Sequence, residues 1–182
     1  LVVCEMVDLL MLDLIDKGLV TDQLVLTVGY DIDNISTGRS VGEYKGEVVK
    51  DRYGRKIPKH AHGTQNLGRH TSSTRKIIDA TMALFDRIID KTLLARRLNL
   101  TACNVIREED IPEIESYEQI SLFDMAEAAN ADNNAEEKER ALQEAMLLIK
   151  HKYGKNAILK GTNYTEGATA RERNRSIGGH KA

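Results

Sequence analysis

The sequence predicts an α+β fold in which two helices cover one face of a small antiparallel sheet. Two segments carry apolar residues at helical spacing, and three shorter segments alternate apolar with polar residues. Their order along the chain is helix, strand, strand, helix, strand, which suits helices packed on one sheet face. The chain has no Trp and only 2 Phe among 182 residues, so we expect an aliphatic core.

The first predicted element is a helix over residues 1–17. Its polar residues fall on one arc of a 3.6-residue helix, namely Glu5, Asp8, Asp13, Asp16 and Lys17. Apolar residues fill the remaining arc, so most sides of this helix should be buried. Gly18 is a natural end for it, and the alternation over residues 24–30 then predicts a strand.

The middle of the chain predicts an excursion, a strand and a second helix. Residues 31–57 are rich in Gly, Asp and Ser, and a loop of this length is usually functional or mobile. Weak alternation predicts a strand over residues 58–71. Ser72 and Ser73 are N-cap candidates for a helix whose apolar stripe covers residues 77–89.

The last predicted strand covers residues 97–102 and bears on function. Leu98 and Leu100 should face the helices, because successive side chains of a strand point to opposite faces. Arg97, Asn99 and Thr101 should then point to the face that the helices leave open. An open sheet face with polar and basic side chains is a plausible binding platform.

Beyond residue 106 the composition changes, and we divide the chain accordingly. Residues 1–107 are predicted to form the globular domain, and residues 108–135, acidic and then rich in Ala and Asn, a linker. Residues 136–154 are predicted to form a helix, and residues 155–182 a polar tail that is ordered only where a partner holds it. The chain begins without Met and inside a helical pattern, so we expect it to be a fragment of a longer protein.

Composition gives broad limits. The formal net charge of −2 does not by itself indicate a nucleic-acid partner. Cys4 and Cys103 lie far apart without CxxC spacing, which favours reduced thiols in a cytosolic protein. Charged residues interrupt the apolar first 20 residues, which excludes a membrane span and does not fit a signal peptide. We therefore expect a cytoplasmic location and no membrane partner.

The charge is nevertheless unevenly distributed. Between residues 52 and 76 there is no Asp or Glu, while cations and histidines cluster: Arg52, Arg55, Lys56, Lys59, His60, His62, Arg69, Arg75 and Lys76. These residues should make one positive surface that neutralises DNA phosphates without sequence preference, and Arg97, Asn99 and Thr101 could extend it. Few aromatic residues lie nearby, so duplex backbone is favoured over single-stranded bases. The alternative is a solvated basic loop without a ligand.

A short linear motif lies in the predicted linker. Gln119, Ile120, Ser121, Leu122 and Phe123 fit the form of bacterial sliding-clamp-binding peptides, which is Gln, an aliphatic residue, any residue, Leu and Phe. Leu122 and Phe123 would fill an apolar pocket of the clamp, while Gln119 would form hydrogen bonds at its rim. The alternative is that these apolar residues begin a packed helix.

The sequence contains partial matches to nucleotide-binding and metal-binding motifs, but each match lacks a required residue. Gly63 and Gly68 have P-loop spacing, but Arg69 and His70 follow where Lys and Ser/Thr are required. His60 and His62 lack a third ligand at a sensible spacing. We therefore expect no catalytic residue, no metal site and no cofactor in this chain.

Several runs together resemble the C-terminal half of UmuC-type (ImpB/MucB/SamB-like) Y-family translesion DNA polymerases of Gram-positive bacteria. The runs are residues 16–23 (DKGLVTDQ), 51–60 (DRYGRKIPKH), 63–68 (GTQNLG), 155–161 (KNAILKG), 172–174 (ERN) and 177–182 (IGGHKA). The resemblance implies a little-finger domain, a β-α-β-β-α-β unit that grips the duplex backbone near a lesion. The clamp motif stands where that family carries one, just beyond the last strand.

The resemblance also implies what the parent protein does. It would be an error-prone DNA-directed DNA polymerase of the SOS response, with Mg²⁺ held by palm-domain carboxylates that precede this region. This chain alone would be catalytically silent, with primer-template DNA, the sliding clamp and SOS accessory proteins as partners. The family's first strand has no counterpart here, which would leave an unpaired sheet edge. The alternative function is a non-catalytic regulatory protein that binds the clamp or SOS partners without gripping DNA.

Overall fold

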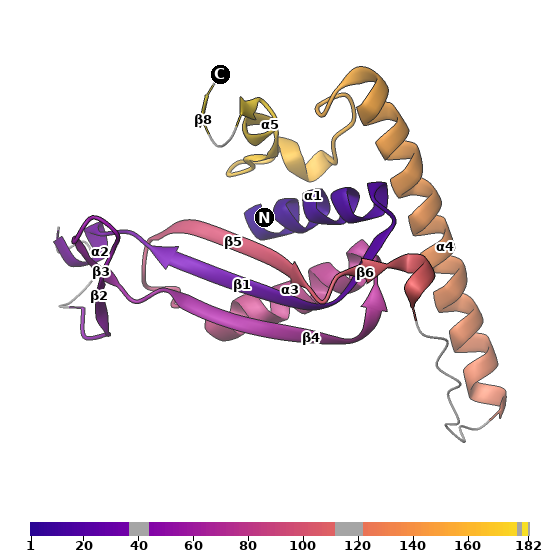
Figure 1. The fold of residues 1–182 in the computed structure, drawn as a ribbon, viewed down its shortest axis with the longest axis horizontal. Coiled ribbons are helices and arrows are strands. Elements are labelled where there is room, and N and C mark those ends of the chain that lie inside the picture. The colour runs from indigo at the N-terminus through magenta and orange to yellow at the C-terminus, as the bar shows by residue number, and fades with distance from the viewer. Residues whose placement is uncertain (37–43, 112–121, 178–179, 182) are drawn as a thin grey trace.

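A computed structural model describes residues 1–36, 44–111, 122–177 and 180–181, with backbone alone for residues 122–134, 177 and 180–181. Its centre is β1 (Leu19–Tyr30), which pairs antiparallel with β4 (Ala61–Thr71) on one side and with β5 (Ala95–Cys103) on the other. A short strand, β6 (Ile106–Arg107), pairs with the first residues of β1. Figure 1 shows the three long strands side by side. The predicted antiparallel sheet is confirmed.

Two helices, α1 (Val2–Asp16) and α3 (Thr74–Ile88), pack on one face of this sheet. Alternate β1 residues point to them and are fully buried, including Leu24 and Leu26. Met11 of α1 and Ile77 of α3 complete an aliphatic cluster around Leu24. Ser73 is the N-cap of α3, and its hydroxyl accepts a hydrogen bond from the Lys76 N–H. The predicted α+β class and the placing of both helices are therefore confirmed.

The predicted excursion contains short elements of its own. After α2 (Asp33–Ser36), the strands β2 (Val48–Lys50) and β3 (Lys56–Pro58) form a hairpin at the end of the sheet. The buried side chain of Asn34 ties this end to the start of β5. It donates to the carbonyl oxygens of Asp31 and Leu94, and it accepts from the Leu94 N–H. The hairpin is thus anchored to the sheet.

Several boundaries differ from the sequence prediction: β4 begins at Ala61 rather than at residue 58, and β5 covers Ala95–Cys103 rather than residues 97–102. β1 begins at Leu19 rather than at residue 24, because Val20 pairs with β6 and the buried Thr21 donates its hydroxyl to the Cys103 carbonyl. Residues 108–110, expected to begin the linker, form the 3₁₀ turn η1 (Glu108–Asp110), and Ile106–Arg107 form β6 at the end of the predicted globular domain.

The helix predicted over residues 136–154 is present but longer. α4 (Leu122–Tyr153) has 32 residues and includes the stretch expected to be linker-like. It packs against α1 and crosses beyond the end of the sheet opposite the hairpin (Figure 1). Among the described residues, none of the helices combines the length and the apolar content needed to cross a lipid bilayer.

The C-terminal segment packs on α1. It contains η2 (Gly161–Tyr164), α5 (Ala170–Arg173) and a small pair of strands, β7 (Ser176–Ile177) and β8 (His180–Lys181). The buried Glu5 carboxylate of α1 accepts hydrogen bonds from the Asn163 side chain, from the N–H and hydroxyl of Thr169, and from Arg173. The partner that holds this segment is therefore the chain's own first helix.

Candidate nucleic-acid interface

The sheet face opposite α1 and α3 is open and polar. In the register of the sheet, Thr27 of β1 lies between His62 of β4 and Asn99 of β5, and Val25 lies between Thr64 and Thr101. His62, Thr64, Asn99 and Thr101 are exposed, whereas Leu98 and Leu100 pack toward the core. The predicted orientation of Arg97, Asn99 and Thr101 is thus confirmed, and His62 shares their face.

Local contacts fix the middle of this face. Thr27 Oγ1 lies 2.9 Å from His62 Nδ1, which orients the imidazole across the strands. The His60 ring lies edge-on to His62, with 6.5 Å between the ring centroids. Within the described residues, no group of three His, Cys, Asp or Glu side chains could hold a metal ion. Both histidines are exposed to solvent.

A pocket rich in arginine lies at the hairpin end of the open face. It has a volume of about 420 Å³, and its cationic lining consists of Arg52, Arg55, Arg96 and Arg97. Arg52 and Arg55 come from the turn between β2 and β3, while Arg96 and Arg97 come from the start of β5. Gly29 also lines the pocket and lies opposite Arg97 in the sheet register.

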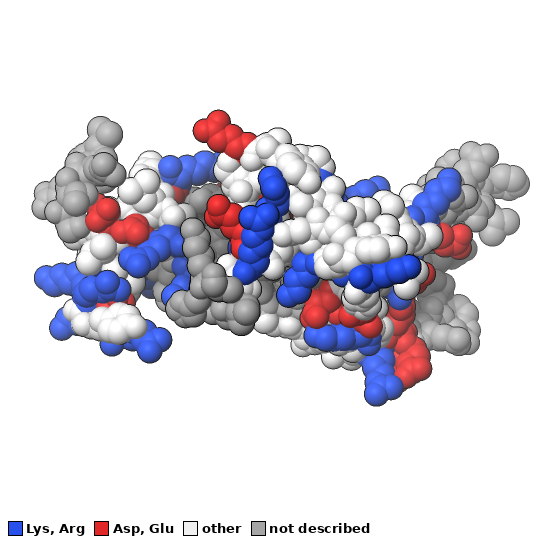
Figure 2. All heavy atoms as spheres, turned by 90° about the horizontal axis from the view of Figure 1, so that it is seen from above, with Lys and Arg blue, Asp and Glu red and all other residues white. Residues whose placement is uncertain are grey.

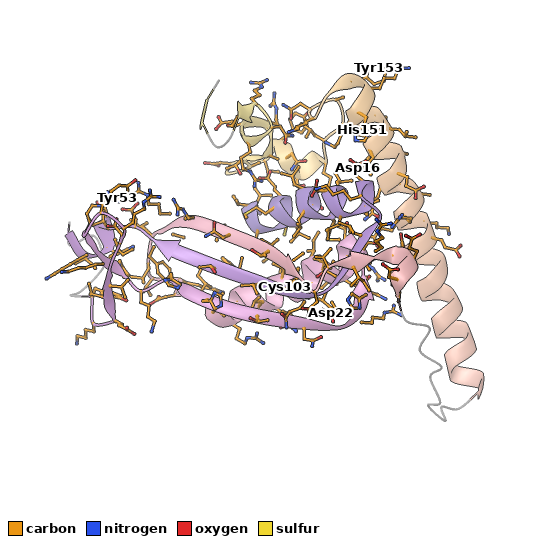
Figure 3. All side chains as sticks on the ribbon, in the orientation of Figure 1. Asp16, Asp22, Tyr53, Cys103, His151 and Tyr153 are labelled. Atoms are coloured by element: carbon orange, nitrogen blue, oxygen red, sulfur yellow. The ribbon has the colours of Figure 1, made fainter. Side chains whose placement is uncertain are left out.

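Aromatic and acidic groups arrange these arginines. The guanidinium carbons of Arg52 and Arg55 each lie 5.2 Å from the centroid of the Tyr53 ring. Tyr53 is 70% exposed and stands at the end of the molecule opposite α4, as Figure 3 shows. Asp51 pairs with Arg55 at 2.7 Å, and Asp31 lies 3.8 Å from Arg96. Because the four arginines of the pocket outnumber these two acidic partners, Asp51 and Asp31, the pocket carries net positive charge.

The Asp51 carboxylate is ionised in this setting. Desolvation acts to raise the pKa of Asp51, but hydrogen bonds from the Arg55 side chain and from the Arg55 and Tyr53 N–H groups outweigh it. Its pKa is consequently held below the ordinary value. The carboxylate fixes the turn that presents Arg52, Tyr53 and Arg55.

The remaining cations are spread from the hairpin to the first turn of α3 rather than gathered in one cluster, and a single DNA-binding surface made by all of them stays a prediction. β4 has 11 residues, so its two ends are roughly 30 Å apart. Residues that follow one another in the basic run are therefore divided between opposite ends of the sheet. Figure 2 shows Lys and Arg gathered at the hairpin end and mixed with Asp and Glu toward the other end.

Near the hairpin, Lys59 pairs with Glu47 at 2.7 Å, and Lys56 is exposed on β3. At the far end, Arg69 pairs with Glu136 of α4 at 3.2 Å, and Lys76 contacts the same carboxylate. The cations at the far end therefore have acidic partners from α4. The sequence does not show this pairing, because Glu136 lies more than 50 positions from Arg69 and Lys76 along the chain.

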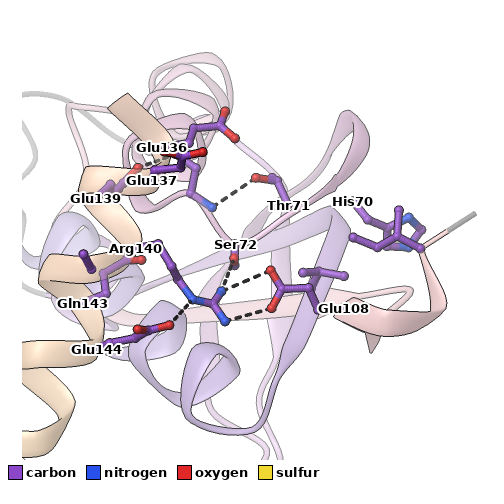
Figure 4. A pocket seen from close by; sticks show the side chains of 14 residues that line it. His70, Thr71, Ser72, Glu108, Glu136, Glu137, Glu139, Arg140, Gln143 and Glu144 are labelled. Atoms are coloured by element: carbon purple, nitrogen blue, oxygen red, sulfur yellow. Dashed lines mark hydrogen bonds and ion pairs between the residues drawn. The ribbon is translucent and has the colours of Figure 1, made fainter. Parts of the chain in front are cut away.

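Arg75 belongs to the far group as well. Its backbone N–H donates to Glu139 of α4 at 2.9 Å. A second pocket, of about 430 Å³, lies where α4 faces the β4–α3 turn (Figure 4). Arg140 crosses it and donates to both oxygens of Glu108, to Glu144 and to Ser72. Burial acts to lower the pKa of Arg140, but Glu144 and Glu108 outweigh it and raise the pKa, so the guanidinium remains charged.

Arg96 was missed in the sequence, although an Arg-Arg pair at the start of a strand was a usable signal. The clamp motif falls largely outside the described residues: Gln119, Ile120 and Ser121 are not described, and for Leu122 and Phe123 the structure gives only the backbone of the first turn of α4. Clamp binding therefore stays a prediction.

Comparison with known proteins gives one informative similarity. Over 122 residues, 66% of this chain, the sequence is 34% identical to the "Putative UV-damage repair protein UvrX" of Bacillus subtilis (strain 168). No protein-family model and no solved structure matches the chain. The matched region is 25% of the Bacillus protein, so the chain spans about a quarter of the length of that relative.

Proposed function

We propose that this chain is the DNA-binding region of a UmuC-type, error-prone Y-family polymerase that acts in translesion synthesis and DNA repair. The observation that carries the proposal is the open, polar sheet face that ends at the four-arginine pocket. The similarity to a UV-damage repair protein supports a role in DNA repair. Such a role would place the protein in the cytoplasm.

The dimensions of the face suit a duplex. Strands lie about 4.8 Å apart, so β4 and β5 are separated by about 10 Å across β1. The major groove of B-DNA is about 12 Å wide and admits a two-stranded β-ribbon, so two neighbouring strands of the face can approach it together. Side chains such as Asn99, Thr101 and His62 can form hydrogen bonds with sugar and phosphate groups, while the arginines supply charge. Contacts of this kind hold the backbone without reading its sequence.

Polymerisation itself would belong to another part of the parent protein. In the UmuC-type family the palm domain supplies the carboxylates that bind Mg²⁺. This chain would therefore grip the DNA product while chemistry proceeds elsewhere.

We also propose that Gln119, Ile120, Ser121, Leu122 and Phe123 tether the parent protein to the sliding clamp. The match of these residues to the clamp-binding form supports this. Leu122 and Phe123 would be the anchors, because apolar and aromatic side chains in a pocket dominate peptide binding.

The DNA-binding proposal is tested by removing charge from the arginine pocket. We expect Arg96→Gln with Arg97→Gln to weaken binding to a fluorescent primer-template about tenfold in an anisotropy titration between 50 and 200 mM salt. The slope of log K against log salt should also lose about 1.8, which is 0.9 for each lost phosphate contact. A control, Lys152→Gln with Arg171→Gln, removes the same charge from α4 and α5. Equal effects of the two double variants, or binding that does not depend on salt, would refute the proposal.

A second function has one observation in its favour. Glu136 forms ion pairs with both Arg69 and Lys76, and the chain as a whole carries a formal charge of −2. A regulatory or interaction protein that binds the clamp or SOS partners would not need a free basic surface. A gel shift with a primer-template at low salt separates the two functions, because the interaction protein would give no shift.

A further inference from the structure

Two glutamates of α4 contact the far end of β4 and the first turn of α3. Glu136 Oε1 lies 3.2 Å from an Arg69 guanidinium nitrogen and also contacts the Lys76 ammonium group. Glu139 accepts a hydrogen bond from the Ser73 hydroxyl at 2.7 Å and another from the Arg75 N–H at 2.9 Å. The two carboxylates thus cover the end of β4 and the first turn of α3.

These groups are the ones that a DNA phosphate would use. Two cations, a hydroxyl and a backbone N–H at the start of a 15-residue helix together favour a bound oxyanion. A carboxylate supplies the same negative charge and the same acceptor oxygens. While α4 is seated, Arg69 and Lys76 share the Glu136 carboxylate, so a phosphate that binds both cations must compete with Glu136.

Helix α4 is attached to the domain by several hydrogen bonds, but its ion pair with Arg69 is exposed to solvent. Arg140 holds α4 to Glu108 and Ser72, and Gln143 donates to the Thr74 hydroxyl at 2.6 Å. By contrast, the Arg69 and Glu136 side chains are 60% and 30% exposed. Ion pairs with this exposure are weak and are screened by salt, so a high local concentration of phosphate can replace them. Figure 4 shows the α4 side chains that face the β4–α3 turn.

We propose that α4 is an autoinhibitory cover of the DNA-binding surface, in which Glu136 and Glu139 stand in for phosphates. This inference rests on the proposed DNA-binding function. With α4 seated, only the hairpin end and the open face contact DNA. When α4 moves away, Arg69 near the end of β4 and Lys76 in the first turn of α3 extend the contact with the duplex past that end of the sheet.

The test removes the negative charges of Glu136 and Glu139 but keeps the length of their side chains. Glu136→Gln with Glu139→Gln is expected to tighten binding to a primer-template about tenfold at 100 mM salt. The salt slope should steepen by about 1.8, because two more cations contact phosphates. The matched control, Glu137→Gln with Glu166→Gln, removes two negative charges from exposed positions and should change affinity far less.

Variants of Arg69 and Lys76 test whether these are the cations that bind DNA once Glu136 no longer pairs with them. In the wild-type background, Arg69→Gln with Lys76→Gln should weaken DNA binding less than in the Glu136→Gln, Glu139→Gln background, because Glu136 contacts both residues while α4 is seated. Added to the Glu136→Gln, Glu139→Gln variant, the same pair should restore the wild-type affinity and slope. Glu139 also caps α3, so Glu136→Gln alone is measured too, with circular dichroism to verify folding; it should give the steeper slope by itself.

The outcomes separate the two proposals. Wild-type binding to DNA, with the Glu136 variants no tighter than the control, overturns the cover and leaves the DNA-binding function standing. Absence of DNA binding in the wild type and in every folded variant overturns the DNA-binding function, and the cover with it. Tighter binding that depends on Arg69 and Lys76 supports both.

Discussion

Glu5 shows how one buried residue can organise a distant segment. It is 2% exposed, and it accepts hydrogen bonds from residues more than 150 positions along the chain. Burial acts to raise the pKa of Glu5, but hydrogen bonds from Thr169 and Asn163 outweigh it and hold the pKa below the ordinary value of 4.5. Since the folded state favours the ionised carboxylate, Glu5 stabilises the fold when it is charged.

This arrangement predicts a dependence of stability on pH. A depressed folded-state pKa stabilises the fold above the unfolded-state pKa, and that stability is lost as the pH falls from about 4.5 through the folded-state value. Glu5→Gln should remove this dependence and cost about 1–3 kcal/mol in the free energy of unfolding at pH 7, because charged hydrogen bonds are lost. Thermal unfolding at pH 7 and pH 4 measures both effects. An unchanged melting temperature at pH 7, equal to that of an exposed control such as Glu166→Gln, would contradict the assignment.

At the scale of elements, the close packing of α3 against β4 depends on Gly63. A Cβ atom added to Gly63 would lie 2.8 Å from Leu84 Cδ1 and 2.9 Å from Ile88 Cγ2, closer than such atoms approach. Leu84 is fully buried, so its side chain has little freedom to move aside. The missing side chain therefore lets the helix approach the strand.

Two alanine substitutions test this packing. Gly63→Ala should lower the free energy of unfolding by about 1–3 kcal/mol, the usual cost of overpacking a core. Gly29→Ala, on the open face of β1, is the matched control because its Cβ would meet Arg97 Cβ at 3.5 Å, an ordinary contact. Urea denaturation compares the two variants. If both were equally stable, the close approach of α3 would not be needed.

The same elements show what local sequence can predict. Alternation placed β4 and β5, and the Ser73 cap placed the start of α3, because these signals lie within a few residues. The start of β1 was missed because Val20 and Thr21 depend on partners in β6 and β5. The open face followed from strand periodicity, but the arginine pocket joins residues 52–55 to residues 96–97, and no local pattern specifies that pairing.

At the scale of the whole molecule, charge is distributed by the fold rather than by the sequence. The acid-free run becomes a positive hairpin end and a neutralised far end, because α4 returns across the far end with Glu136 and Glu139. Residues 67 positions apart thus decide which cations a ligand can reach. DNA binding should therefore depend on the hairpin end, and clamp binding on a separate segment at the start of α4.

This separation gives the last prediction. Leu122→Ala with Phe123→Ala should weaken binding to the bacterial sliding clamp by about 2 kcal/mol or more, roughly thirtyfold, because two anchor side chains are lost. Duplex affinity should stay within about twofold, since neither residue belongs to the open sheet face. Leu142→Ala with Leu148→Ala is the control, because both leucines lie on the same helix and are 61% and 71% exposed. Calorimetry with purified clamp measures the affinity for the clamp, and fluorescence anisotropy measures the affinity for the duplex.

Equal clamp affinities for the two double variants would show that the motif is not the anchor. A parallel loss of DNA binding would show that the two functions share a surface.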